Sequence, residues 1–350
     1  MKTIKDINVK DKTVLIRVDY NVPLKDGKVV SDLRIRASLP TINYLREQGA
    51  KKIILISHLG RPEGKDKSLS LKPVAESLKN LLPNVTFVDD VSGPDVEQAA
   101  SELKDGAILL LENLRFFPGE EQNSDDFIRE IIDSTKADLY VQDGFAVIHR
   151  AHASTDAVKN HLPVYAGLLL EKEVRNLKAA TEHPEHPVLL IIGGAKVDDK
   201  QPLIEKFLTQ ADQIFVGGKI AADGYSSNNP KILVAEDFDE NAEGQKLDIG
   251  PLSTGKLADL ITDAKTIIWN GLLGYAEDPA YATASTITAE MLGEKTDATT
   301  IICGGDTTGF VENLMESHPN LNYSLVSTGG GASLELLLGK ELPGLTAIRS

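Results

Sequence analysis

Short apolar runs rich in β-branched residues recur along the chain, and longer stretches of mixed apolar and polar residues separate them. Runs of this kind are typical of strands buried on both faces, and the stretches between them are long enough for helices. The alternation predicts an α/β protein with parallel sheets covered by helices on both sides. The predicted strands are Val14–Val18, Lys52–Ile56, Ile108–Leu111, Leu139–Val141, Val188–Ile192, Gln213–Val216, Thr266–Trp269, Thr300–Cys303 and Tyr323–Val326.

A break near the middle of the 350-residue chain indicates two domains. Leu170, Val174 and Leu177 follow i, i+4, i+7 spacing, which predicts an amphipathic helix over 168–182. Two prolines, Pro184 and Pro187, then stop the helical pattern. We interpret the break as a domain junction, although the pattern alone also fits a crossover helix within a single domain.

Composition narrows the possible partners. The formal net charge of −15 opposes general binding to nucleic acid or to an anionic membrane, so we expect neither as a partner. Cys303 is the one cysteine, which excludes an internal disulfide and fits a reducing compartment. No apolar run approaches the roughly 20 residues that span a bilayer, and charges interrupt the N-terminal segment where a signal peptide would be apolar. We therefore expect a cytoplasmic protein.

The residues that follow the predicted strands of the first half are polar and basic. Ligands of open parallel sheets bind at the carboxyl ends of the strands, and arginine suits carboxylate and phosphate oxygens. A single arginine there could equally be a solvated or ion-paired surface residue, but several together in an acidic chain indicate a small, multiply anionic ligand. The candidates are Asp19, Asn21, Arg34, His58, Arg61, Arg115, His149 and Arg150.

The same positions in the second half carry glycines. Glycine lets backbone amides approach phosphate closely, and a following helix N-terminus adds positive potential, so five such turns indicate a nucleotide site. Asp306 is placed to reach a phosphate-bound Mg²⁺, although a helix N-cap is an equal alternative. We interpret Cys303 as a buried small residue. The turns are Gly193-Gly194-Ala195-Lys196, Gly217-Gly218, Asn270-Gly271, Gly304-Gly305-Asp306-Thr307 and Thr328–Ser333.

Taken together, these segments resemble the phosphoglycerate kinase family. The similarity runs almost from end to end, and the segments occur in the family's order. They are Arg17–Pro23, Arg34–Ile42, Ser57–Pro62, Ser70–Ala75, Leu111–Phe116, Pro118–Glu121, His149–Ser154, Gly193–Val197 with Asp199 and Lys200, Leu247–Pro251, Trp269–Gly271, Gly304–Thr307 and Ser327–Glu335.

The resemblance implies two doubly wound, Rossmann-like parallel-sheet lobes joined by a hinge helix, with the active site in the interlobe cleft. It implies an N-terminal lobe over 1–167, a hinge helix over 168–184, a nucleotide lobe over 185–335, and a tail over 336–350 that returns to the first lobe. Such proteins are monomers that move a phosphoryl group reversibly between 1,3-bisphosphoglycerate and Mg-ADP, giving 3-phosphoglycerate and ATP.

The resemblance also assigns roles to residues. Those expected to hold 3-phosphoglycerate are Asp19, Asn21, Arg34, His58, Arg61, Arg115, His149 and Arg150. Those expected at the nucleotide are Gly193, Gly194, Ala195, Lys196, Lys200, Gly217, Gly218, Asn270, Glu277 at the ribose, Gly304, Gly305, Asp306 at the metal, and Thr307. Those expected to act on the transferring group are Arg34, Lys196, Lys200, Gly330 and Gly331.

Departures from the family pattern fall near the expected adenine pocket. Between Gly224 and Lys231 the chain lacks most of a helical region that is usual in the family. In addition, Lys219 replaces a usual glycine, Leu272 a usual proline and Cys303 a usual glycine. These differences predict an altered nucleotide preference or weaker nucleotide binding. Three alternatives are a homologue that only binds ligands, a kinase for another small acyl phosphate, and a nicotinamide oxidoreductase, which would require a glycine fingerprint that is absent here.

Overall fold

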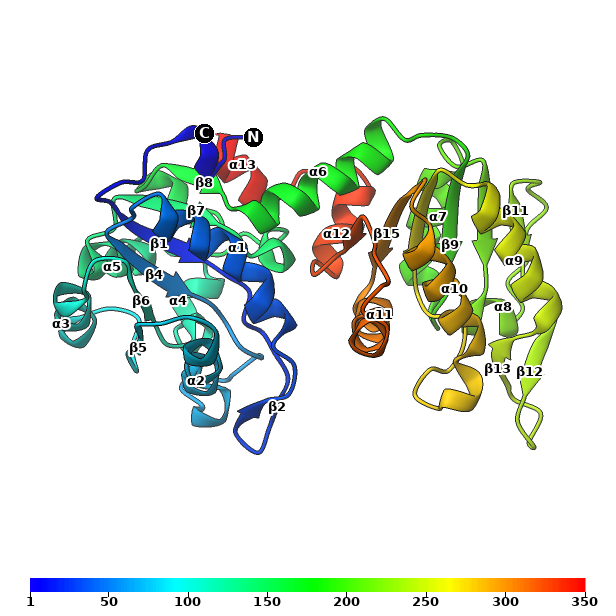
Figure 1. Ribbon diagram of the computed structural model, residues 1–350, viewed down its shortest axis with the longest axis horizontal. Coiled ribbons are helices and arrows are strands. Elements are labelled where there is room, and N and C mark those ends of the chain that lie inside the picture. The colour runs from blue at the N-terminus through cyan, green and yellow to red at the C-terminus, as the bar shows by residue number, and fades with distance from the viewer. Residues whose placement is uncertain (350) are drawn as a thin grey trace. The chain divides into compact units, whose positions relative to one another are not determined.

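The computed structural model describes residues 1–349, and the described chain divides into two units (Figure 1). The first unit is Met1–Lys172 together with the residues from Glu341 onward, and the second unit is Glu173–Lys340. Each unit contains its own six-stranded sheet and its own buried apolar core.

The sheet of the first unit is parallel throughout. Its strand order is β5 (Val85–Phe87), β6 (Ala107–Leu110), β4 (Lys52–Ile56), β1 (Thr13–Arg17), β7 (Leu139–Gln142) and β8 (Val164–Ala166). In the central strand β1 all five residues are buried, as expected for a strand covered on both faces.

Helices cover this sheet because alternate strand residues point to opposite faces. Val14 and Ile53 form one apolar cluster with residues of α1 and α2, whereas α5 contacts β1. The helices and short elements of the first unit are η1 (Ile4–Asp6), β2 (Leu24–Lys25), β3 (Lys28–Val29), α1 (Leu33–Glu47), η2 (Lys67–Leu69), α2 (Lys72–Leu81), α3 (Pro94–Glu102), η3 (Leu114–Phe116), α4 (Pro118–Glu121), α5 (Asp125–Thr135), η4 (Phe145–Val147), η5 (Ala157–Asn160) and α13 (Pro343–Arg349).

The sheet of the second unit is also parallel. Its order is β11 (Ile232–Val234), β10 (Gln213–Val216), β9 (Val188–Ile192), β14 (Thr266–Asn270), β15 (Thr299–Cys303) and β16 (Leu325–Val326). The remaining elements are α7 (Val197–Phe207), α8 (Gly218–Ala222), the hairpin β12 (Phe238–Glu240) and β13 (Lys246–Ile249), α9 (Pro251–Asp263), η6 (Pro279–Tyr281), α10 (Thr283–Glu294), α11 (Gly305–Ser317) and α12 (Gly331–Leu337).

These two sheets confirm the predicted fold class of two parallel-sheet α/β lobes. The strand predicted at Tyr323–Val326 is shorter and begins at Leu325. The edge strands β5, β8 and β11 were not predicted. Each of these has only three residues, which is too short to give a clear periodicity.

Helix α6 (Leu168–Glu182) has the limits that the apolar spacing predicts, and its N-terminus is anchored by side chains of the first unit. The Leu168 amide donates to Thr41 Oγ1 at 2.9 Å. The amides of Leu169 and Leu170 donate to Asp143 Oδ1 at 3.0 and 3.2 Å. These bonds supply partners for amides that have none inside the helix. The division between the units falls after Lys172, within the helix.

The C-terminal residues return to the first unit, where the Gly344 amide donates to the Ile148 carbonyl at 2.9 Å. The return begins at Glu341, because residues 336–340, placed in the tail by the sequence, belong to the second unit. Ser350, the last residue of the predicted tail, lies outside the described residues.

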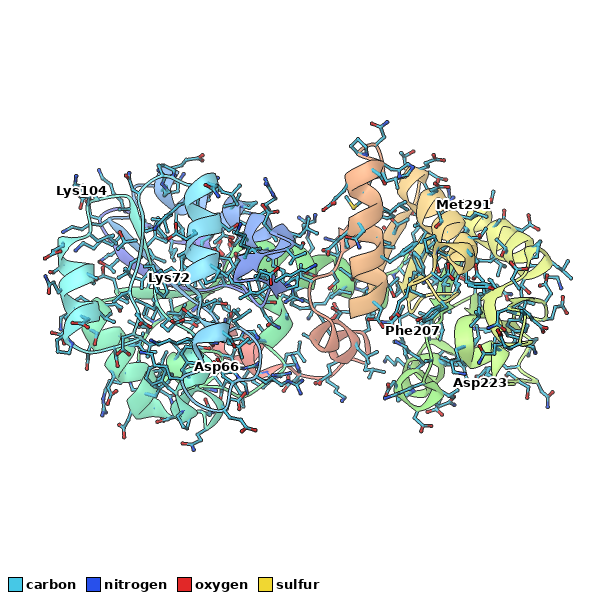
Figure 2. The ribbon with its side chains drawn as sticks, turned by 90° about the horizontal axis from the view of Figure 1, so that it is seen from below. Asp66, Lys72, Lys104, Phe207, Asp223 and Met291 are labelled. Carbon is cyan, nitrogen blue, oxygen red and sulfur yellow. The ribbon has the colours of Figure 1, made fainter. Side chains whose placement is uncertain are left out.

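Charged side chains cover the outside of each unit. Asp66, Lys72 and Lys104 are exposed on the first unit, and Asp223 on the second (Figure 2). Phe207, in contrast, is fully buried. Within residues 1–349, every helix is too short or too polar to cross a bilayer.

The buried carboxyl group of Asp143 makes the stability of the first unit depend on pH. Burial raises its pKa to about 7, against the opposing effect of the Leu169 and Leu170 amides. The folded state therefore holds a proton that the unfolded state releases above about pH 4. Stability should fall as pH rises from about 4 through about 7, by roughly 1 to 4 kcal/mol.

Asp143→Asn keeps the Oδ1 acceptor and cannot titrate, so it should lack this part of the pH dependence. Amide hydrogen exchange of β1 and β4 at about pH 5 and about pH 8 measures the difference in the first unit. An equal pH dependence in both proteins would contradict the prediction.

Candidate functional sites in the two units

In the first unit, basic side chains gather around His58, directly after β4. Burial lowers the pKa of His58 well below its usual value, and the charges of Arg17, Arg115, Arg34 and Arg150 lower it further. These charges come from β1, η3, the start of α1 and the segment after η4. The parallel sheet thus brings together at one edge residues that are far apart in the sequence.

Three of the predicted arginines are held by specific contacts. Arg34 forms an ion pair with Asp19, which is 5% exposed. Arg115 donates to the Gly60 carbonyl at 2.6 Å, and burial together with the Arg150 charge lowers the Arg115 pKa to about 10. Arg150 Nε lies 3.3 Å from His149 Nε2.

Two further residues predicted at this site, Asn21 and Arg61, lie in the segments that follow β1 and β4. Asn21 is exposed and accepts the Gly60 amide on its Oδ1 at 2.9 Å. Arg61 is exposed on the turn after His58. Several guanidinium groups that the sequence predicts at one site therefore lie around His58, and their binding of a small anion stays a prediction.

A buried network behind His58 was not recognised from the sequence. Arg17 is 1% exposed and Glu120 is fully buried. Arg17 Nε donates to Ser154 Oγ at 2.8 Å, and Ser154 Oγ donates to Glu120 Oε1 at 2.6 Å. The signal was present, because Arg17 is a charge within the otherwise apolar run Val14–Val18.

In the second unit, glycines allow the turns after β9 and β14 to touch. Gly271 has φ +103°, and a Cβ atom there would lie 2.2 Å from the Gly193 carbonyl oxygen. Both positions therefore require glycine for backbone conformation or close approach. Thr307 Oγ1 accepts the Gly271 amide at 2.8 Å and fixes this turn to the start of α11.

Lys200 is held at the centre of these turns. Its ammonium group donates to Asn270 Oδ1, and Asn270 Nδ2 lies 3.3 Å from Cys303 Sγ. Burial lowers the pKa of Lys200, while the negative charges of Asp199 and Asp306 oppose the shift. Cys303 is fully buried, and burial raises its pKa to about 11. This fits the expected structural thiol.

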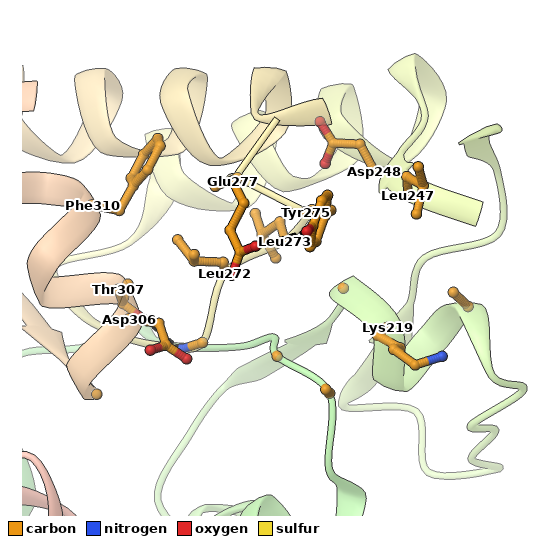
Figure 3. Close-up of a pocket in the computed structure, with 18 of the residues that line it drawn as sticks. Lys219, Leu247, Asp248, Leu272, Leu273, Tyr275, Glu277, Asp306, Thr307 and Phe310 are labelled. Atoms are coloured by element: carbon orange, nitrogen blue, oxygen red, sulfur yellow. Dashed lines mark hydrogen bonds between the residues drawn. The ribbon is translucent and has the colours of Figure 1, made fainter. Parts of the chain in front are cut away.

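The glycine turns open onto a cavity of about 700 Å³ within the second unit (Figure 3). The predicted residues that line it are Gly194, Ala195, Lys196, Lys200, Gly218, Glu277, Gly304, Gly305, Asp306 and Thr307. A cavity of this size suits a drug-sized ligand such as a nucleotide. Gly193, Gly217, Asn270, Gly330 and Gly331 were also predicted at the nucleotide or the transferring group, and they lie outside the lining.

The wall of the cavity adds Leu273, Tyr275 and Phe310, which the sequence did not single out, to the expected Leu272, Lys219 and Glu277. Leu272, Leu273 and Phe310 give it an apolar side, and Tyr275 donates to Glu277 Oε2 at 2.7 Å (Figure 3). Lys219 lies across the cavity on α8. Apolar residues next to a few polar groups are typical of pockets that bind small molecules or cofactors.

No cluster of three or more His, Cys, Asp or Glu side chains able to hold a metal occurs among residues 1–349. Asp306 is exposed at the start of α11, beside the glycine turn and on the cavity wall. Because Mg²⁺ that enters on phosphates keeps several waters and needs only one or two protein carboxylates, a single aspartate fits such an ion.

The two units thus combine a cluster of arginines at one sheet with a glycine-lined cavity at another, an arrangement that suits a phosphotransferase with two substrates. The family model described as phosphoglycerate kinase matches residues 4–232 and 222–340. The chain belongs to the phosphoglycerate kinase family.

Individual relatives agree with this assignment. The chain is 42% identical to the phosphoglycerate kinase of Moorella thermoacetica and 40% identical to that of Fervidobacterium nodosum, over 99% of this chain and 98% of each relative. The solved phosphoglycerate kinase of Pyrococcus horikoshii OT3 matches with a TM-score of 0.87 and 28% identity, covering 100% of this chain and 98% of that one. The solved phosphoglycerate kinase of Coxiella burnetii matches with a TM-score of 0.81 and 32% identity, covering 99% of this chain and 98% of that one.

The comparison with Moorella thermoacetica spans 393 aligned positions, more than the 350 residues of this chain, so the relative has residues with no counterpart here. The two matches of the family model meet at 222–232, where the sequence indicated a missing helical region. Residues 225–229 have no regular secondary structure in this segment, between α8 and β11. Next to it, Lys219 and Ala222 line the cavity.

The hydroxyl group of Thr307 should stabilise the second unit. Thr307→Val keeps the shape of the side chain but leaves the buried Gly271 amide without its acceptor, which costs about 1 to 3 kcal/mol. Thr307→Ser keeps the acceptor and should be close to wild type. Trp269 is the one tryptophan and is fully buried in β14, so its fluorescence during urea unfolding reports on this unit. Equal stability of the valine and serine variants would contradict the assignment.

Proposed function

We propose that the chain catalyses reversible phosphoryl transfer between 1,3-bisphosphoglycerate and Mg-ADP, giving 3-phosphoglycerate and ATP. The observation that carries the proposal is that both binding surfaces occur in one chain. Several arginines surround His58 in the first unit, and a glycine-walled cavity with Lys200 and Asp306 occupies the second. Family membership supports the same reaction.

The first unit binds 3-phosphoglycerate in this proposal. The phosphate and the carboxyl end of the substrate are both anionic, and planar guanidinium groups bind such oxygens with paired hydrogen bonds. Arg34 has the further role of stabilising charge on the transferring group. The residues assigned to this site are Asp19, Asn21, Arg34, His58, Arg61, Arg115, His149 and Arg150.

The second unit binds the nucleotide. Lys196 and Lys200 meet the phosphates, Glu277 meets the ribose, and Asp306 would hold Mg²⁺, which supplies positive charge at the phosphate oxygens. Backbone amides near Gly330 and Gly331 supply further donors to the transferring group. The other nucleotide residues are Gly193, Gly194, Ala195, Gly217, Gly218, Asn270, Gly304, Gly305 and Thr307.

Transfer in this scheme is direct and in line, because phosphoryl transfer depends mainly on positioning and charge neutralisation. The ionised carboxylate of 3-phosphoglycerate is already a nucleophile, so the reverse reaction needs no general base. The two substrates bind separate units and must meet, so we infer that the units close with α6 as the hinge. One chain carries both surfaces, and we propose that it acts as a cytoplasmic monomer.

Replacing Arg34 by alanine should lower kcat about a hundredfold or more, because a preorganised donor to transition-state charge is lost. Arg36→Ala is the matched control, since Arg36 lies on the same helix and pairs with Asp32 on the surface. A coupled assay with ATP and 3-phosphoglycerate measures both. Near-normal turnover of Arg34→Ala would reject its role, and an inactive wild-type protein would favour the homologue that only binds ligands.

The altered wall of the cavity should weaken ADP binding. With the region near 222–232 shortened and Lys219 at the wall, we expect the Kd for ADP to exceed that of the Moorella thermoacetica relative by about tenfold, equivalent to about 1.4 kcal/mol. Calorimetric titration of both proteins with ADP, and then with GDP, measures affinity and preference. Equal affinity for ADP, with equal discrimination against GDP, would contradict this prediction.

A further inference from the structure

The side chain of His58 has one hydrogen-bond partner within residues 1–349, and that partner is Arg17. Arg17 Nη2 lies 3.1 Å from His58 Nδ1. A guanidinium group has only N–H donors and stays protonated, so Nδ1 must be the acceptor and can carry no proton. The single proton of a neutral imidazole then resides on Nε2, on the opposite side of the ring.

The surroundings of His58 disfavour a second proton. The ring is 4% exposed, and the charges of Arg17, Arg115, Arg34 and Arg150 all act on it. Two carboxylates pair with arginines of this cluster. Asp19 pairs with Arg34, and Glu121 Oε1 lies 3.2 Å from Arg115 Nε. His58 is thus a poor site for another positive charge.

Arg17 itself is held by a buried network rather than by solvent. Besides His58, its guanidinium donates to Ser154 Oγ at 2.8 Å and to the Val18 carbonyl at 2.6 Å. Glu120 Oε1 lies 4.0 Å from Arg17 Nη2 and accepts from Ser154, which balances the buried positive charge. His152 Nδ1 lies 3.8 Å from the same oxygen. Several contacts therefore fix the direction in which Arg17 points.

We propose that Arg17 holds His58 as the uncharged Nε2–H tautomer, and that His58 binds the anionic substrate as a neutral hydrogen-bond donor from Nε2. Arg17 is then a positioning residue, because it acts on the substrate through His58. This inference rests on the proposed function for the identity of the anion, a phosphorylated hydroxy acid. The tautomer of His58 is a property of the ligand-free protein and does not depend on the identity of the anion.

The tautomer can be read from ¹H–¹⁵N correlation spectra of the uniformly labelled, ligand-free protein. The chain has seven histidines, and His58→Gln identifies the signals of His58 by their disappearance. We expect a protonated Nε2 and an unprotonated Nδ1 throughout about pH 5.5 to about pH 8, a range that spans the usual histidine pKa. Saturating 3-phosphoglycerate should shift the Nε2 signal and leave the tautomer unchanged. A protonated Nδ1, or an imidazolium formed on substrate binding, would overturn the proposal.

Two substitutions of His58 test the charge in the assay. His58→Gln keeps a neutral N–H donor near the position of Nε2, whereas His58→Leu keeps none. We expect the KM for 3-phosphoglycerate to change less than about threefold for glutamine and to rise about tenfold for leucine, the effect of losing one hydrogen bond to a charged group. The KM for ATP should stay constant in both. Equal losses for the two variants would show that a neutral donor at this position does not suffice, against the proposal.

The role of Arg17 is tested by Arg17→Met combined with Glu120→Gln, which removes both buried charges together. His58 in this variant should show mixed tautomers and titrate within the same pH range, and the KM for 3-phosphoglycerate should rise about tenfold. Arg129→Met with Asp126→Asn removes a pair from the surface of α5 and serves as the control. An unchanged His58 spectrum in the Arg17→Met, Glu120→Gln variant would contradict the proposed role of Arg17.

The experiments distinguish failure of the proposed function from failure of the tautomer proposal. A wild-type protein with no activity on 3-phosphoglycerate would refute the function, while the spectrum of the ligand-free protein would still decide the tautomer. If the buried double variant does not fold, the wild-type spectrum and the two His58 variants still decide the proposal.

Discussion

All neighbouring strands in the two six-stranded sheets run parallel, and the positions of the functional residues follow from this constraint. In a parallel sheet every strand ends at the same edge, so segments that are distant in the sequence meet there. In the first unit this brings Arg34, His58 and Arg115 together. In the second unit it brings the turns after β9, β14 and β15 to one cavity.

The two candidate sites differ in their charged groups. The first concentrates arginines in a chain of net charge −15, and two of them, the buried Arg17 and the partly exposed Arg34, lie near the carboxylates of Glu120 and Asp19. The second carries charges of both signs, among them Lys196, Lys200, Glu277 and Asp306, beside glycines whose turns approach one another closely. Both candidate sites therefore offer local positive charge in an acidic protein, which is what the proposed anionic substrates need.

Much of the fold was readable from the sequence. The long apolar strands and helix α6 were predicted close to their observed limits, because their periodicity is strong. The three-residue edge strands were missed, since tertiary pairing rather than local pattern forms them. The return of the C-terminus was placed five residues too early. Helix α12 continues the second unit, and no local signal marks where the chain leaves it.

The sequence by itself determined the fold class, the family, and which residue types end each strand, since these depend on local composition and order. Only the tertiary structure decided which of those residues touch. It placed Arg17 against His58 and Glu120 behind Ser154, a network whose members lie far apart in the chain. It also gave the cavity its apolar wall at Leu272 and Phe310. Distances and burial of this kind depend on packing between elements, which no local pattern encodes.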